Sequence, residues 1–395
     1  MPTTLLLPLA LLGLASVAAL AAPRPEAAGL RIGYSRVRTD IPGSRWVNAV
    51  TMRAWLVNGD GTGARELAAE LITRPATCTQ FAGWSPDGRT AIIGCGWESE
   101  ENGRWEEEHQ QFRFTAETNL YDTYFLDLAS GELTNLTAVE RVSFYNTGIF
   151  FWPDDPTRLG FQALINGDSH PFSMNLDGTG KKDLSGGVAG FSYGYSASPD
   201  GKRISYHRDY QIYIADADGS HIQHVETGNP FNFCPKWSPD GQWLMFVSGE
   251  HYDCHPYVCR ADGTGLRKLA DRNGWRGVVT IFDVPDHHGG SSDVPVWAQD
   301  GRSVYYTAMV GQSLELMRVS LEGKVEQLTH SAPGVLHYHP SPSPDGKWLL
   351  FGSTRSGRRQ LYVSRPDGTE AQAVTDVPEG WAAMWGIWAP VAAAK

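Results

Sequence analysis

Short apolar runs separated by turn signals recur along the chain. Five clear examples are TAIIGC, RISYH, WLMFVS, SVYYTA and WLLFGS, at 90–95, 203–207, 243–248, 303–308 and 348–353. Runs of this length, rich in β-branched and aromatic residues, indicate strands rather than helices. Each run follows a turn of the Ser-Pro-Asp-Gly type, and a second turn with Asp-Gly or Glu-Gly comes after the next strand. Each repeat therefore predicts four short antiparallel strands, which we name a to d.

The first of these turns marks seven repeats. Its third position falls at intervals of 40 to 67 residues, on Pro86, Pro153, Pro199, Pro239, Gln299, Pro344 and Pro390. Four strands in a period of about 45 residues are typical of a β-propeller blade. Six repeats are complete, whereas the seventh is split between residues 30–70 and a C-terminal strand, Trp385–Pro390. We therefore expect an all-β fold: a seven-bladed β-propeller of four-stranded antiparallel blades, its ring closed by N- and C-terminal strands in one blade.

The chain begins with an apolar run, Leu5 to Leu20, which ends in small residues ahead of Pro23. That pattern is typical of a cleaved secretory signal, and an uncleaved anchor helix is the alternative. The run is shorter than the roughly 20 residues that span a membrane. We expect residues 1–21 to be a signal peptide and residues 22–395 a single seven-bladed propeller. The mature protein would then be periplasmic or secreted, with no membrane span.

Charge and cysteine content narrow the function classes. The net charge of −11 argues against a nucleic-acid partner, because no basic face is available for phosphates. Five cysteines in an oxidising compartment suggest disulfides. Cys78 and Cys95 flank the first turn symmetrically, so a regular hairpin places them opposite each other and predicts a disulfide. For Cys234, Cys254 and Cys259 we expect at most one further pair.

The WSPDG and DGTG signals, which alternate over nearly the whole mature chain, resemble the TolB-type, WD40-like propeller family. The resemblance implies the fold but leaves function open, since such propellers bind proteins, carry enzymes, or do both. TolB proteins themselves have an α/β domain ahead of the propeller. Only a few residues separate the predicted signal from the first strand, so we do not expect a TolB of the Tol system.

Polar residues gather on one predicted face. Chain direction alternates within a blade, so the b–c loops and the segments that lead into each strand a share the face opposite the a–b turns; we call it the b–c face. Seven of the 12 histidines project to it, from three consecutive repeats: His251, His255, His287, His288, His330, His337 and His339. The same face is expected to receive Arg208, Arg355, Tyr195, Asp293, Trp381 and Trp385.

The His337-Tyr338-His339 triplet is the strongest metal signal. Strand alternation puts the two histidines on one side, roughly 6.5–7 Å apart, so both can reach one ion. A third ligand would come from the pair His287 and His288, and imidazoles suit Zn, Mn, Fe, Ni or Cu. The alternative is that these are solvated or hydrogen-bonded histidines at a strand start.

The HYHP sequence ahead of a SPDG turn resembles the oligogalacturonate lyases, and His337, His339 and Pro340 carry that likeness. The resemblance implies a divalent metal ion, Mn, Zn or similar, and it suggests His251, in a histidine-rich b–c loop, as the catalytic base. The chain departs from the family at Val294, where a third metal histidine is expected. It also lacks a glutamine just before His337, so the substrate does not transfer.

The implied chemistry is β-elimination on a uronate sugar. The C5 proton is too weakly acidic for a free histidine, so a metal or an arginine must stabilise the charge that develops. We assign the catalytic role to His251 with Arg208 and Arg355. For substrate binding the candidates are His255, Tyr195, Trp381 and Trp385.

Two function classes remain open. The first is an exported, metal-dependent lyase that cleaves uronate-containing oligosaccharides, with an acidic oligosaccharide as its partner. The second is a non-catalytic TolB-like propeller that docks a periplasmic protein or peptide. A bound divalent ion would favour the lyase hypothesis. An apolar central channel, which we call the shaft, without a bound metal would favour the docking hypothesis.

Overall fold

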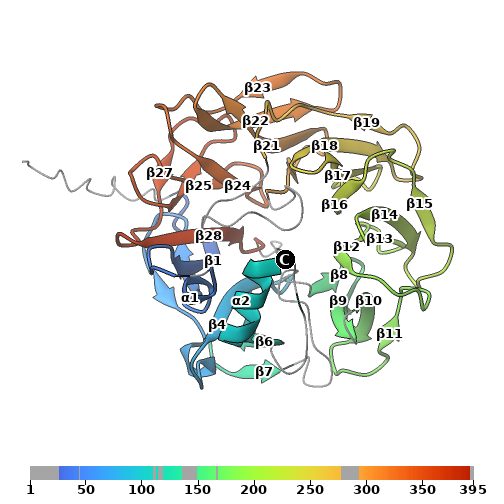
Figure 1. Cartoon of the computed structure of the whole chain (residues 1–395), viewed down its shortest axis with the longest axis horizontal. Coiled ribbons are helices and arrows are strands. Elements are labelled where there is room, and N and C mark those ends of the chain that lie inside the picture. The colour runs from blue at the N-terminus through green and yellow to red at the C-terminus, as the bar shows by residue number, and fades with distance from the viewer. Residues whose placement is uncertain are drawn as a thin grey trace, which may run out of the picture.

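The computed structural model is a β-propeller, in which seven four-stranded antiparallel sheets surround a central axis (Figure 1). The structure describes residues 26–43, 45–109, 113, 119–135, 149–165, 168–276 and 293–391. The predicted fold class is therefore confirmed. The predicted signal peptide, residues 1–21, lies outside the described residues, as do His287 and His288.

Blades 1 to 4 follow the predicted order, with strand a nearest the axis and strand d at the rim (Figure 1). In order from a to d, the strands of blade 1 are β28 (Trp381–Trp388), β1 (Arg31–Arg38), β2 (Arg53–Asn58) and β3 (Arg65–Glu66), and those of blade 2 are β4 (Thr77–Trp84), β5 (Thr90–Glu98), β6 (Asn119–Asp127) and β7 (Leu133–Asn135). The strands of blade 3 are β8 (Phe150–Trp152), β9 (Asp155–Ile165), β10 (Asp168–Asn175) and β11 (Lys182–Asp183), and those of blade 4 are β12 (Ser192–Ala197), β13 (Arg203–Arg208), β14 (Gln211–Asp216) and β15 (Gln223–Val225).

Blades 5 to 7 repeat the same order. Blade 5 consists of β16 (Phe231–Trp237), β17 (Trp243–Glu250), β18 (Asp253–Arg260) and β19 (Arg267–Lys268). Blade 6 consists of β20 (Val296–Trp297), β21 (Ser303–Val310), β22 (Ser313–Ser320) and β23 (Val325–Gln327), and blade 7 of β24 (His337–Pro342), β25 (Leu349–Ser353), β26 (Gln360–Ser364) and β27 (Gln372–Ala373).

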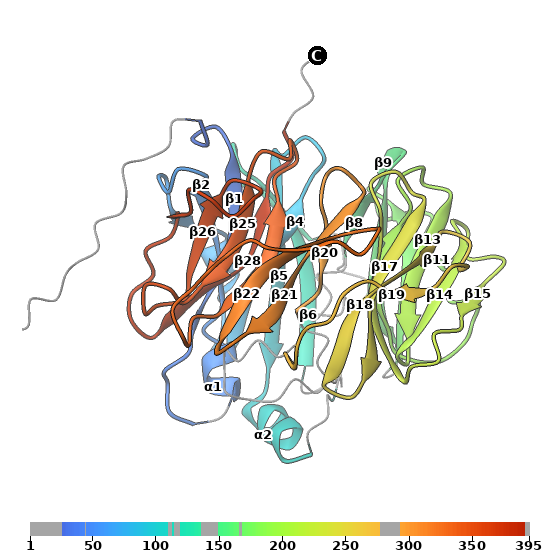
Figure 2. The ribbon, with the colours of Figure 1, turned by 90° about the horizontal axis from the view of Figure 1, so that it is seen from above.

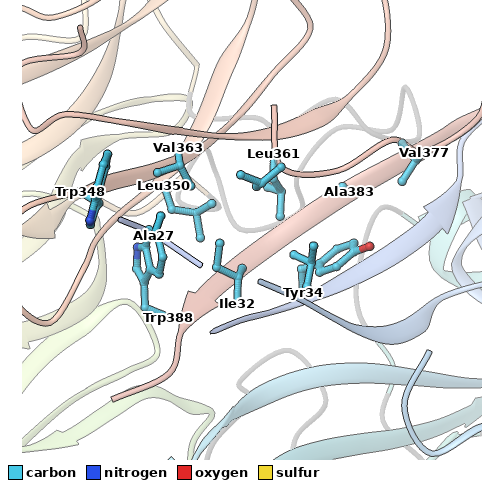
Figure 3. Packing of buried hydrophobic residues seen from close by; sticks show 12 residues of the cluster. Ala27, Ile32, Tyr34, Trp348, Leu350, Leu361, Val363, Val377, Ala383 and Trp388 are labelled. Carbon is cyan, nitrogen blue, oxygen red and sulfur yellow. The ribbon is translucent and has the colours of Figure 1, made fainter. Parts of the chain in front are cut away.

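Blade 1 closes the ring as predicted. Strand β28, from the end of the chain, pairs antiparallel with β1, so that Trp388 lies opposite Ile32 and Trp381 opposite Arg38. Buried apolar side chains join this blade to blade 7, where Leu350 and Leu361 pack with Ile32 in one cluster (Figure 3). The closing strand therefore removes two sheet edges and fills the core between two blades.

The turn motif explains why its residues recur. Ser85 donates a hydrogen bond to Asp87 and accepts one from the backbone N–H of Thr90. The tryptophan that begins or precedes the turn links neighbouring blades, because Trp84, Trp297 and Trp388 donate from their indole nitrogens to carbonyls of Ile387, Lys236 and Ser341 in the preceding blade. One short motif therefore fixes the hairpin and joins the blades.

Two helices stand on the b–c face (Figure 2). They are α1 (Arg45–Ala49), inserted between strands b and c of blade 1, and α2 (Glu100–His109), inserted at the same point of blade 2. A short 3-10 helix, η1 (Ala69–Leu71), follows β3. The sequence analysis predicted none of these, because the strand repeat gave no signal for insertions. Among the described residues, no helix is long and apolar enough to cross a bilayer.

The predicted disulfide is wrong. The hairpin of β4 and β5 has a register shift between Phe81 and Gly83, which pairs Cys78 with Gly96 and Cys95 with Thr79. The two cysteines are therefore one position out of step across the hairpin, since a bulge adds an extra residue to one strand. All five cysteines, each in the described part of the chain, are thiols.

Candidate functional site

The inner strands share a bulge five residues before the proline of the turn. Gly194, Cys234, His339 and Trp385 hold this position in blades 4, 5, 7 and 1, with φ values of 68°, 50°, 50° and 50°. In each of these strands the pairing register shifts at that point. A bulge re-aims the side chain it carries. His337 and His339 both meet carboxylates from the blade 6 part of the chain, Glu315 and Asp293, whereas Tyr338 between them bonds to Ala383 of blade 1. These contacts agree with the expected alternation, although each imidazole has its own carboxylate.

His337 is fully buried against the preceding blade. Its Nε2 lies 2.8 Å from the hydroxyl of Ser331 and 3.5 Å from Oε2 of Glu315, which comes from β22. Burial lowers the pKa of His337, although Glu315 opposes that shift. Burial would raise the pKa of Glu315, but hydrogen bonds from His337, Thr329 and the Ser331 backbone outweigh it and lower that pKa to about 2. A neutral imidazole thus faces an ionised carboxylate.

His339 faces a second buried carboxylate. Its Nδ1 lies 3.7 Å from Oδ1 of Asp293, whose side chain is 2% exposed. Asp293 also accepts a hydrogen bond from the Thr307 hydroxyl, and its backbone carbonyl accepts one from Arg272. Burial lowers the pKa of His339, with Asp293 opposing. The ring lies 5.8 Å from that of Trp385, so this predicted residue does meet the histidine pair.

The two histidines share one feature that bears on metal binding. Nδ1 of His337 and Nε2 of His339 are buried and have no hydrogen-bond partner among the residues that the structure describes, whereas the other nitrogen of each ring faces a carboxylate. Metal-bound histidines are held in this way, with the second nitrogen directed at a carboxylate that fixes the ring. Both imidazoles therefore fit the role of metal ligands.

A complete metal centre is not formed by the residues that the structure describes, in which no three His, Cys, Asp or Glu side chains converge to hold an ion. The predicted third ligand, His287 or His288, lies outside them. His330 is exposed and stands in the segment that leads to His337.

The two catalytic arginines lie on different blades. Arg355 follows β25, and its guanidinium lies 5.4 Å from the ring of Phe351, which in turn contacts His337 edge-on. Arg208 ends β13 and lies 4.4 Å from the Tyr213 ring; it is 9% exposed, and its Nη1 has no partner. The structure therefore brings Arg355 to the His337 side of the shaft and leaves Arg208 in blade 4.

The predicted base, His251, is exposed at the b–c turn of blade 5, where its ring contacts Phe231 and Tyr252 at 5.0 and 4.1 Å. His255 is buried instead. Its Nδ1 accepts the backbone N–H of Arg272 at 3.2 Å, and its Nε2 lies 3.2 Å from Asp253. Burial lowers the pKa of His255. Its contacts fix Arg272, which in turn holds Asp293.

The remaining predicted ligand-binding residues divide between core and surface. Tyr195 is 5% exposed and packs edge-on against Phe150, in the core between blades 3 and 4, and burial raises the pKa of its hydroxyl. Trp381 is partly exposed beside Arg36 and Arg38, at 5.3 and 5.5 Å. Trp385 remains at the shaft with His339.

Sequence reasoning missed Glu315 and Arg272, both almost fully buried. A signal for Glu315 was present, because it interrupts the apolar strand SLELMRVS, and a carboxylate is rarely buried without a partner. Arg272 follows β19 with no such pattern around it. Its Nε and Nη1 have no partner, while its backbone and Nη2 hold His255 and Asp293 together.

A second buried polar cluster links the two helices. Arg45 donates to Glu106 at 2.8 Å and to Glu98 at 3.3 Å, and the Asn102 side chain donates to both carboxylates. Burial, and then the charge of Glu98, raise the pKa of Glu106 to about 7. The cluster of Arg45, Glu98, Asn102 and Glu106 therefore holds a proton-binding carboxyl at the base of α2.

Comparison with known proteins supports the fold. Residues 209–385 match the profile of the family described as PD40, TolB beta propeller domain. The chain resembles the crystal structure of TolB from Acinetobacter baumannii at a TM-score of 0.51 and 17% identity, covering 92% of this chain and 68% of that one. It resembles an oligogalacturonate lyase in complex with manganese at 0.54 and 15%, covering 83% and 84%. At these identities the likeness concerns the fold alone.

Among curated relatives, an uncharacterized protein of Agrobacterium fabrum is 28% identical over 185 residues, which are 40% of this chain. The match spans 60% of that relative, and matches to two others span 28% and 33% of their lengths. The likeness therefore concerns only part of this chain and part of each relative.

Proposed function

We propose that the chain is an exported, metal-dependent lyase that cleaves uronate-containing oligosaccharides by β-elimination at the b–c face. One observation carries the proposal: His337 and His339 each direct one ring nitrogen at a buried carboxylate, and the other nitrogen has no partner in the described part of the chain. Burial keeps both rings neutral, which is the protonation state that binds a metal. His287 or His288 would complete the ligand set.

A bound divalent ion would supply Lewis acidity toward the uronate carboxylate and so stabilise the charge that develops at C5. The protein's own residues would do the remaining work. Glu315 and Asp293 fix the orientation of the two imidazoles. Arg355, beside Phe351 on the His337 side, would bind the carboxylate, with Arg208 as the alternative from blade 4.

His251 is the proposed base, since it is exposed on the same face and histidine is the side chain that most often serves as a general base. It would remove the C5 proton as the bond from C4 to the departing oxygen breaks, which leaves a C4–C5 double bond. The departing oxygen takes up a proton from water. Trp385, against His339, would contact the sugar at the metal, with Trp381 and His255 at the edge of the site.

The likeness to the oligogalacturonate lyase with manganese supports this function, because it extends over most of both chains. The apolar run from Leu5 to Leu20 supports export, with residues 22–395 as one domain. The substrate would be an acidic oligosaccharide, and the chain as a whole is acidic, so a local cation or metal must attract it.

The decisive experiment combines metal analysis with an activity assay. Purified protein is tested for bound manganese and zinc, and then for formation of unsaturated product from oligogalacturonate by ultraviolet absorbance. We expect close to one divalent ion per chain, activity that chelation removes, and recovery on adding manganese. If the purified protein contains no metal and binds no added ion, the proposed lyase function is overturned.

The alternative is a docking propeller that binds a periplasmic protein or peptide. The TolB-type repeat favours it, as does the exposed group of aromatic rings around His251 on blades 4 and 5. A protein that binds no metal but captures a peptide on this face would support it.

A further inference from the structure

A continuous row of aromatic rings crosses blades 4 and 5 on the b–c face; we call it the aromatic ladder. It consists of Tyr193, Phe233, Tyr210, Phe231, His251 and Tyr252. Successive ring centroids in that order are 4.9, 6.3, 5.1, 5.0 and 4.1 Å apart. Phe233 is buried, His251 is exposed and the other four are partly exposed. The ladder thus begins beside the inner strands and ends at the outer turn of blade 5.

Two residues of the aromatic ladder have an unfavourable backbone conformation. Tyr210 and Tyr252 occupy the two-residue b–c turns of blades 4 and 5, with φ values of 61° and 60°. In blade 6 the corresponding two-residue turn has its positive φ at its first residue, Gly311, at 61°. Glycine takes this left-handed conformation without cost, whereas a tyrosine pays a free-energy penalty for it. Large aromatic residues persist at such positions when their side chains serve a function.

The chemistry around the ladder fits a sugar chain. The guanidinium of Arg276 lies 4.4 Å from the Tyr252 ring, and Asp209, next to Tyr210, is exposed. A sugar ring has an apolar C–H face, which packs on an aromatic ring, and a rim of hydroxyl groups, which pair with planar charged side chains. A uronate adds a carboxylate for the arginine.

The ladder also reaches the proposed reaction site. Phe231, Tyr193 and Tyr210 pack on a buried cluster that Val294 joins from blade 6. The neighbouring residue, Asp293, is the carboxylate that faces His339. One buried cluster therefore joins the ladder to the segment that carries Asp293.

We propose that the aromatic ladder is the binding track for the sugar rings of an acidic oligosaccharide that lie beyond the reacting uronate. This inference rests on the proposed function, because it assigns the same substrate class. In this proposal Tyr210 and Tyr252 bind the sugar rings of the oligosaccharide and take no part in the β-elimination step. Affinity should therefore rise with the number of sugar rings, and the increase should depend on these two residues.

The test uses Tyr210→Gly and Tyr252→Gly, separately and together. Glycine adopts the left-handed conformation without strain, but each variant loses the packing of its ring, so binding is compared at a temperature below the thermal transition of every variant. Calorimetry with di- and tetragalacturonate in excess chelator measures binding without turnover. We expect affinity for the tetramer to fall about tenfold in the double variant, or ~1.4 kcal/mol, with disaccharide affinity unchanged. The matched control is His221→Gly, which relieves a similar strain (φ 50°) on the opposite face.

The outcomes separate this inference from the proposed function. A wild type that binds the tetramer no better than the dimer, or a double variant that keeps the tetramer affinity, overturns the track. A peptide that binds in place of the sugar and depends on both tyrosines also overturns it. If the tyrosines are needed for tetramer binding but no unsaturated product forms with manganese, the track holds and the lyase fails.

Discussion

Glu315 lies 3.5 Å from Nε2 of His337, although the two residues belong to different blades. The contact is part of a network, because Glu315 also accepts hydrogen bonds from Thr329 and from the backbone and side chain of Ser331. A carboxylate with this many donors stays ionised and immobile. It therefore fixes the ring of His337 and leaves Nδ1 as the nitrogen available to a ligand.

Replacing Glu315 with glutamine tests that role. The amide keeps the shape of the side chain but loses the charge that orients the imidazole and raises its basicity. We expect the affinity for manganese to fall roughly 10- to 100-fold, which is typical when such a supporting carboxylate is removed. Calorimetric titration of metal-free protein measures it.

The matched control is Glu326→Gln, on the neighbouring strand β23. Glu326 is exposed and pairs with Arg318, so its loss should leave metal affinity unchanged. Equal affinity of Glu315→Gln and wild type for manganese would show that the carboxylate does not support a metal ligand.

The histidine pair itself makes a second prediction. His337→Ala and His339→Ala should each abolish formation of unsaturated product, because each removes one metal ligand, while circular dichroism still reports a folded propeller. His337→Ala opens a buried cavity, so a lower melting temperature is expected for that variant. The assay is ultraviolet absorbance on oligogalacturonate with added manganese.

His224→Ala is the control for this pair, since His224 lies at the rim, with its nitrogens directed at Glu226 and Gln211. It should retain full activity. A His339→Ala variant that retains activity would assign the reaction to other residues.

The fold was predictable because its signals are local. In the turn, Ser85 and Asp87 bond to each other and to the next strand, so the sequence of one hairpin specifies that hairpin. Seven copies then predict the ring. The pairing of β1 with β28 is not local, and it was predictable for a different reason: each half-blade had sheet edges that only the other half could cover.

The site was harder to predict because it depends on register and on contacts between blades. The inner strand of blade 7 has a bulge at His339, and the shift near Phe81 moves Cys78 out of step with Cys95. Neither has a sequence signal, since non-glycine residues hold the positive φ at His339 and Cys234. Glu315 meets His337 only after two blades have packed together.

Closure of the ring predicts a cooperative loss of structure on truncation. Removing residues 380–395 deletes β28, exposes the edge of β1 and empties the core that Trp388 and Ala383 share with blade 7. We expect no cooperative thermal transition and rapid proteolysis throughout. Removing residues 391–395 alone leaves β28 complete and should keep the wild-type transition. A cooperative transition in the longer deletion would mean that six blades are stable as an open ring.

The carboxyl of Glu106 predicts how stability depends on pH. Its pKa is raised from 4.5 to about 7 in the folded state, chiefly by burial. Below pH 4.5 the group is protonated in both states, and its contribution to stability is complete. As the pH rises toward 7, the unfolded chain releases this proton first, so the free energy of unfolding falls, by up to about 3 kcal/mol. Above pH 7 this decrease in the free energy of unfolding is complete. Chemical denaturation at pH 5, 6, 7 and 8 measures this trend.

Glu106→Gln isolates the contribution of this one group. The amide cannot ionise, so the difference in stability between the variant and the wild type should grow from pH 5 to 7 and then level off. Glu108→Gln, on the exposed side of α2, should follow the wild type at each pH. A difference between Glu106→Gln and wild type that stays constant from pH 5 to 8 would mean that Glu106 is ionised throughout, with Arg45 at 2.8 Å outweighing its burial.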